Sequence, residues 1–242
     1  MQMSNNSIDL SNKQQCHDYQ MSEFPRFDIL FEDVKKLNYA TMQPEIKMFI
    51  DELYSFYSLS HGILDIYSDE AHKTAEFKQM SYPVMRRLLE KYFNILYIFD
   101  DQAKITNRYK SYLRSIEIQY NKMLKDLTEN NYPVNGLPNE MRKYSSEDAY
   151  PSDVKSMLAT VKNNNVKPNG KNIGLDFLYP TYRILSFYAH GNLSQVIIDE
   201  LSSCKNFSII KIPETINLIA NHYNIIIGNL FPDILKKYNF TL

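Results

Sequence analysis

Apolar residues that recur every three or four positions are the feature of this chain that most constrains its fold. The spacing follows the 3.6-residue period of the α-helix, so it gathers the apolar side chains on one helical face. The segments that show it are 24–39, 44–67, 69–99, 102–127, 180–191 and 213–238. With a short helix expected at 152–162, they predict an all-α bundle of about six or seven helices.

Prolines and glycines set several of the predicted helix ends. Pro83 lies inside the 69–99 segment, which predicts either a kink or two helices that meet near Ser81. Proline suits a first helical turn and glycine suits a C-terminal cap. One helix is therefore expected to start beside Pro180 and to end at Gly191.

The chain is expected to form one domain after a polar leader. Residues 1–22 are rich in Asn, Ser and Gln and offer few apolar side chains for burial, which predicts a disordered leader. Residues 23–242 are long and apolar enough for a single helical domain. Within them, the short apolar runs at 195–201 and 207–212 fit either a small late β-hairpin or further helix, because period alone does not assign so short a run.

Cysteine usage and hydropathy indicate a compartment. The two cysteines, Cys16 and Cys204, stand far apart and form no CxxC pair. They supply neither a disulfide framework nor a cysteine metal site, which favours a reducing environment. The leader lacks the basic start and apolar run of a signal peptide, and no apolar stretch is long enough to span a bilayer. We therefore expect a cytoplasmic protein with no membrane partner.

Glycine content, motifs and charge exclude several functional classes. The chain has six glycines, none of them clustered, so it lacks the phosphate-binding loops of kinases, ATPases and dehydrogenases. It has no HExxH or GxSxG motif and no paired Glu-x-x-His segments, so neither a metal nor a cofactor is expected. The formal net charge is −1, so any nucleic-acid site has to be a local patch.

One predicted helix concentrates polar side chains that can carry chemistry. At helical spacing, Tyr179, Arg183, Ser186 and His190 fall on one stripe of the segment 179–191. His190 would lie in the last turn, where the helix dipole favours the protonated imidazole. An imidazole that titrates near neutrality can act as a general acid or base.

This segment resembles the HEPN superfamily, a group of small helical proteins of which many are ribonucleases of toxin and phage-defence systems. The family motif is an Arg, four to six residues and a His on one helix, and six residues separate Arg183 from His190. The segments 85–94, 108–109 and 186–191 also look like an uncharacterised bacterial branch of HEPN-like proteins. The resemblance extends over about residues 49–192.

The resemblance implies an endoribonuclease that needs no metal, in which a ribose 2′-hydroxyl attacks the adjacent phosphate. His190 would move protons, Arg183 would neutralise the phosphorane oxygens, and Ser186 or Tyr179 would orient the phosphate. It also implies a homodimer that acts on RNA in a toxin–antitoxin or antiviral defence system, restrained by a cognate antitoxin or regulator.

Two further groups of residues are predicted to support such a site. Arg86 and Glu90 stand four residues apart and are expected either to line the cleft beside the histidine or to form an ordinary helical ion pair. Arg108, Tyr109 and Arg114 alternate cations with aromatic rings, as RNA-binding surfaces do. A solvated face on a long helix explains that second pattern as well.

Two other functions remain open on sequence grounds. The HEPN-like family often has Asn, Asp or His directly after the Arg, whereas this chain has Ile184. The first alternative is therefore a catalytically silent HEPN-like module that binds RNA, a nucleotide or a partner protein. The second is a purely structural helical partner in a larger assembly.

Overall fold

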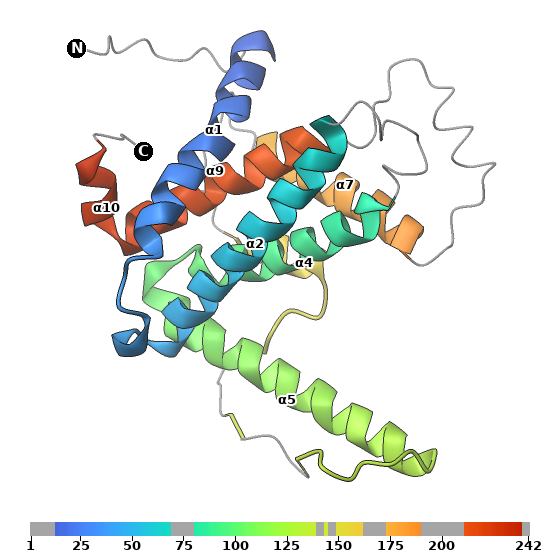
Figure 1. The fold of residues 1–242 in the computed structure, drawn as a ribbon. Helices are drawn as coiled ribbons and strands as arrows, with labels where there is room; N and C mark the ends of the chain where they lie inside the picture. Colours follow the sequence, from blue (N-terminus) through green and yellow to red (C-terminus); the bar gives the residue numbers. More distant parts are fainter. Residues whose placement is uncertain are drawn as a thin grey trace, which may run out of the picture. The chain divides into compact units, whose positions relative to one another are not determined.

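The structure is a computed structural model that describes residues 13–68, 80–138, 143–144, 149–161, 173–189 and 211–238 (Figure 1). In these ranges the chain forms α-helices and two short 3-10 helices, with no strand. The all-α prediction is therefore confirmed for the described part of the chain. The late segments considered for a hairpin lie outside the described residues as far as 210, and Ile212 begins a helix.

The chain divides into two compact units. The first combines Met1–Phe93 with Asn163–Leu242, and the second is Asn94–Lys162. The boundary falls inside helix α4 (Ser81–Phe99), which supplies residues to both units. α4 begins at Ser81, so Pro83 lies in its first turn, where the missing N–H costs no helical hydrogen bond.

The core of the first unit forms around α9 (Ile212–Leu230), which is buried on almost every side. Helix α1 (Lys13–Val34) lies along α9, and α2 (Pro44–Ser68) also contacts it (Figure 1). The apolar faces predicted from the sequence meet here, and burial of each large side chain contributes about 1.5–3 kcal/mol. Their buried residues include Phe27, Leu30, Phe31, Phe49, Leu53, Phe56, Ile216, Ile219 and Tyr223.

Two helices start earlier than predicted, and each runs through a proline. α1 starts at Lys13, within the segment expected to be a leader, and contains Pro25; α7 (Ile173–Ala189) contains Pro180. An internal proline costs about 3 kcal/mol because it removes a hydrogen bond and crowds the preceding turn. Both proline rings are exposed, whereas the same helices bury large apolar side chains. That burial offsets the cost, so the predicted start of α7 at Pro180 was wrong.

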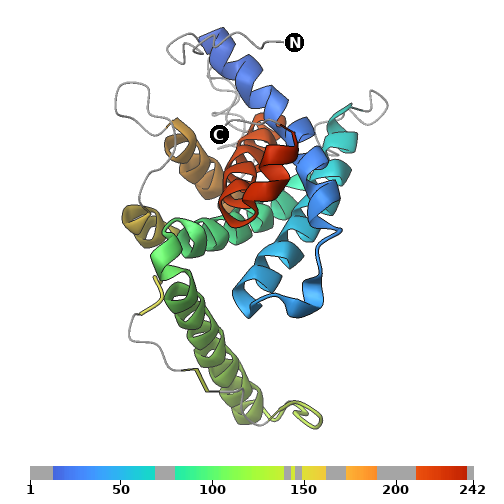
Figure 2. The ribbon, with the colours of Figure 1, turned by 90° about the vertical axis from the view of Figure 1, so that its left-hand side faces the viewer.

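The predicted single helix 213–238 is two helices, α9 and α10 (Pro232–Lys237). The break is at Phe231, whose φ of −132° and ψ of 65° are not helical, because a residue before proline is disfavoured in the helical region. α10 lies against α9 and α1 (Figure 2). The Asp33 carboxylate of α1 holds it there by accepting from Lys237 Nζ at 2.7 Å and from the Tyr238 hydroxyl at 2.8 Å.

The second unit contains the end of α4, a 3-10 turn at Gln102–Lys104, α5 (Ile105–Glu129) and α6 (Val154–Thr160). Asp101 caps the 3-10 turn by accepting from the backbone N–H of Ala103 at 3.2 Å. None of the helices in the described ranges combines the length and apolar character that a membrane crossing requires.

Candidate functional site

Four polar side chains of the first unit meet where α4 faces α7. Arg86 and Glu90 stand one turn apart on α4, and Tyr182 and Ser186 stand one turn apart on α7. Each pair lies beside residues that anchor its helix in the core, which are Met85 and Leu89 on α4 and Leu178 and Leu185 on α7. Helical periodicity therefore places each polar pair at the edge of the buried face of its own helix.

Arg86 links the two helices. Its Nη1 and Nη2 donate to the two carboxylate oxygens of Glu90 at 3.1 and 2.7 Å, and its Nε donates to Ser186 Oγ at 3.3 Å. The Ser186 hydroxyl in turn donates to the carbonyl of Tyr182 at 2.8 Å. Ser186 therefore holds the guanidinium of Arg86 in place, and its own proton is already engaged by the backbone.

Tyr182 completes this group, which we call the α4–α7 cluster: Arg86, Glu90, Tyr182 and Ser186. The Tyr182 hydroxyl donates to Glu90 Oε1 at 3.1 Å, and its ring centroid lies 5.7 Å from the guanidinium carbon of Arg86. Burial and the nearby Glu90 carboxylate raise the pKa of Tyr182 above its ordinary value, so the phenol stays protonated and donates this hydrogen bond at neutral pH.

The α4–α7 cluster is accessible to solvent. The side chains of Arg86 and Glu90 are 21% and 36% exposed, so the ion pair is only partly desolvated. Arg86 and Glu90 therefore form the helical ion pair that was one of the two expectations, and Arg86 also contacts Ser186 of the predicted α7 stripe. Such an arrangement can bind an anion, because a fixed guanidinium fork matches phosphate and carboxylate oxygens. A cleft beside His190 stays a prediction.

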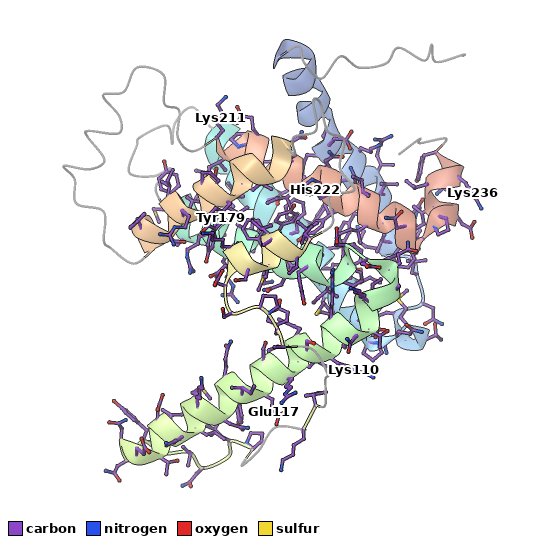
Figure 3. The ribbon with its side chains drawn as sticks, turned by 180° about the vertical axis from the view of Figure 1, so that it is seen from behind. Lys110, Glu117, Tyr179, Lys211, His222 and Lys236 are labelled. Atoms are coloured by element: carbon purple, nitrogen blue, oxygen red, sulfur yellow. The ribbon has the colours of Figure 1, made fainter. Side chains whose placement is uncertain are left out.

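Two other predicted residues of α7, Arg183 and Tyr179, differ in their exposure to solvent. Arg183 is exposed, and its guanidinium carbon lies 5.9 Å from the ring centroid of Phe187. Tyr179 is half-buried, with its ring centroid 6.5 Å from that of Tyr182, and Figure 3 shows it on α7. Residues three apart on a helix have Cβ atoms about 5–6 Å apart, so Arg183 neighbours Ser186 on the helix surface.

His190, the proposed proton carrier, lies outside the described residues, which end on this helix at Ala189. The structure thus brings together Arg86, Glu90 and Ser186, and Arg183 and Tyr179 lie on the same helix as Ser186. Among the described residues, no group of three or more His, Cys, Asp or Glu side chains could hold a metal ion.

The RNA-binding residues predicted on α5 belong to the second unit, and one of them needs correction. Arg108 is only 6% exposed, donates through Nη1 to the carbonyl of Tyr97 and lies 3.8 Å from the Asp100 carboxylate. It holds the turn between α4 and α5, because a buried guanidinium has to find acceptors within the protein. Arg114 is exposed and Tyr109 is half-buried, so these two remain predictions.

Tyr182 is the member of the α4–α7 cluster that sequence reasoning did not single out. It lies four residues before Ser186 and three after Tyr179, so the helical period already placed it between the predicted stripe and the buried face. What the period could not supply was its partner, since Glu90 stands 92 positions away in the sequence.

Comparison with known proteins adds one finding and two negative results. The profile of a family described as "Family of unknown function (DUF5677)" matches residues 74–206, which is 133 of the 242 residues. That range contains all four residues of the α4–α7 cluster together with Arg183 and His190. Neither the curated proteins nor the solved structures yielded a match.

Proposed function

The chain belongs to the family of unknown function DUF5677, and we propose that it is a HEPN-like endoribonuclease that needs no metal and acts from the α7 stripe. The observation that carries the proposal is the hydrogen bond from Arg86 Nε to Ser186 Oγ. It joins a second guanidinium to the stripe that carries Arg183 and, at helical spacing, His190. Among the described side chains of the site, the two arginines and the Glu90 carboxylate together carry one net positive charge, which suits a phosphate.

The proposed reaction assigns each group one task. The 2′-hydroxyl of a ribose attacks the adjacent phosphorus, His190 takes the hydroxyl proton, and a proton returns to the departing 5′ oxygen. Arg183 neutralises the phosphorane oxygens with its planar donors, and Tyr179 orients the phosphate beside it. The products are a 2′,3′-cyclic phosphate and a 5′-hydroxyl. We further infer that the protein works in the cytoplasm as a homodimer in a toxin–antitoxin or antiviral defence system, restrained by a cognate antitoxin or regulator.

A second candidate is a catalytically silent module that binds RNA, a nucleotide or a partner protein at the same surface. One observation favours it. Ile184 follows Arg183 where the HEPN-like family often has a polar residue. Binding requires the arginines and the neighbouring rings of Tyr179 and Phe187, whereas it does not require His190.

The test is expression of the wild type beside Arg183→Ala, His190→Ala and His61→Ala, with growth and cellular RNA integrity as readouts. His61 is a matched control, since it is a partly exposed histidine on α2 that is paired with Asp28 of α1 at 3.1 Å. We expect the wild type and His61→Ala, but not Arg183→Ala or His190→Ala, to arrest growth and to cut cellular RNA. The purified wild type and His61→Ala should also cut RNA in the presence of a chelator, because the proposed reaction needs no metal. If RNA stays intact with every protein, the nuclease proposal is rejected and the binding module remains as the candidate function.

A further inference from the structure

Contacts with Ser186 and Tyr182 hold the Arg86 guanidinium in an orientation that suits an oxyanion. Its Nε is tied to Ser186 at 3.3 Å, and the ring centroid of Tyr182 lies 5.7 Å from its guanidinium carbon. A guanidinium has five N–H donors, and its two Nη groups form the edge that matches two oxygens of a carboxylate or a phosphate. In this structure the edge faces the Glu90 carboxylate, with donor–acceptor distances of 3.1 and 2.7 Å.

Glu90 is placed so that it can leave this fork. Its side chain is 36% exposed, so water can hydrate the carboxylate after it moves. Glu90 Oε1 also accepts a hydrogen bond from the Tyr182 hydroxyl at 3.1 Å, so the carboxylate has a donor besides Arg86. An ion pair in such a partly hydrated position contributes little net stability, so an incoming dianion or phosphodiester can compete with it.

We propose that the Glu90 carboxylate occupies the position that a phosphodiester of single-stranded RNA takes on Arg86, so that RNA binds only when the Arg86–Glu90 pair opens. This inference rests on the proposed function for the identity of the ligand. It assigns Arg86 as a binding residue and Glu90 as an internal competitor that weakens RNA binding. The α4–α7 cluster thereby regulates access to the stripe on α7.

The test uses Glu90→Gln, which keeps the size of the side chain and an acceptor for Tyr182 while it removes the charge. Its matched control is Glu129→Gln on α5, where the same i, i+4 geometry gives an exposed ion pair with Lys125 at 3.7 Å. The probe is a short fluorescent oligoribonucleotide with every 2′-hydroxyl methylated. Because it lacks the attacking hydroxyl, it reports binding by anisotropy whether or not the protein is a nuclease.

We expect Glu90→Gln to bind the probe about five- to tenfold more tightly than the wild type, since it removes charge repulsion at roughly 5 Å in a partly hydrated site. Glu129→Gln should stay within about twofold of the wild type, because it removes the same charge from an exposed ion pair that the proposal does not involve. Adding Arg86→Gln to Glu90→Gln should abolish the gain. Thermal unfolding of each variant verifies that it is folded.

Equal affinities of Glu90→Gln and Glu129→Gln, weaker binding by Glu90→Gln, or no binding by any protein would each overturn the inference. A cleavage assay on unmodified RNA separates this result from the proposed function. If cleavage depends on His190 but Glu90→Gln does not bind RNA more tightly, the nuclease proposal stands and the role of Glu90 as a competitor is rejected. A gain in RNA affinity that depends on Arg86, without any cleavage of RNA, would support Glu90 as a competitor and reject the nuclease.

Discussion

His222 is a buried histidine whose protonation should set the acid stability of the first unit. It lies in the middle of α9 and is only 3% exposed (Figure 3). Its Nδ1 is hydrogen-bonded to the Tyr92 hydroxyl, and the two rings stack with centroids 5.5 Å apart. Burial lowers the pKa of His222 from 6.5 to about 4 and raises the pKa of Tyr92 well above its ordinary value. At neutral pH the phenol therefore donates to a neutral imidazole.

The sign of the pH dependence follows from which state binds the proton. In the unfolded chain a histidine takes up its proton near pH 6.5, whereas folded His222 does so only near pH 4. The stability that this residue contributes is complete above about pH 6.5 and is lost as the pH falls towards about 4. For His222 the full loss corresponds to about 3 kcal/mol, of which about 2 kcal/mol is lost between pH 7.5 and pH 5.

The assay compares the free energy of unfolding of the wild type with that of His222→Asn, measured by urea titration and circular dichroism at pH 7.5 and pH 5. Asparagine keeps an acceptor for Tyr92 and does not titrate, so other acids such as Asp33 cancel in the difference. The advantage of the wild type should shrink by about 2 kcal/mol at the lower pH. An advantage that is the same at both pH values would refute the reasoning. If the variant does not fold, an NMR titration of the imidazole should still show no protonation above about pH 5.

Two stability predictions concern other contacts. Lys91→Ala should cost about 2 kcal/mol in urea unfolding, because Glu52, whose side chain is 8% exposed, loses its hydrogen bond from Lys91 Nζ at 2.8 Å. Adding Glu52→Gln should recover part of that cost, and a loss below about 0.5 kcal/mol would show that the pair is immaterial. Asn131 follows α5 with a φ of 56°, so Asn131→Ala should lower the free energy of unfolding by about 1 kcal/mol, whereas Asn131→Gly should not. Equal thermal stability of those two variants would contradict a left-handed cap.

Helical periodicity predicted the helices whose ends and faces are both set locally. α2 was expected over residues 44–67 and extends from Pro44 to Ser68, since its apolar stripe and its N-terminal proline agree. α1 and α7 were predicted to start too late. The polar composition of residues 1–22 indicated a leader before α1, and Pro180 indicated the start of α7, whereas the helices begin at Lys13 and Ile173. The cost of an internal proline is local, whereas the burial that offsets it depends on partners elsewhere in the chain.

The candidate site shows the same division between local and distant information. Four-residue spacing was enough to pair Arg86 with Glu90, but their link to Ser186 joins positions 100 residues apart and follows only from the fold. The charge of Arg108 misled in the opposite way, because nothing in its sequence context shows that it turns towards Asp100 rather than towards solvent. Because Arg108 is matched within the protein, one of the two cations predicted to bind RNA on α5 is not available for a phosphate. Arg114 of α5 is exposed, so it stays a candidate for a phosphate beside Arg183 of α7, which is also exposed.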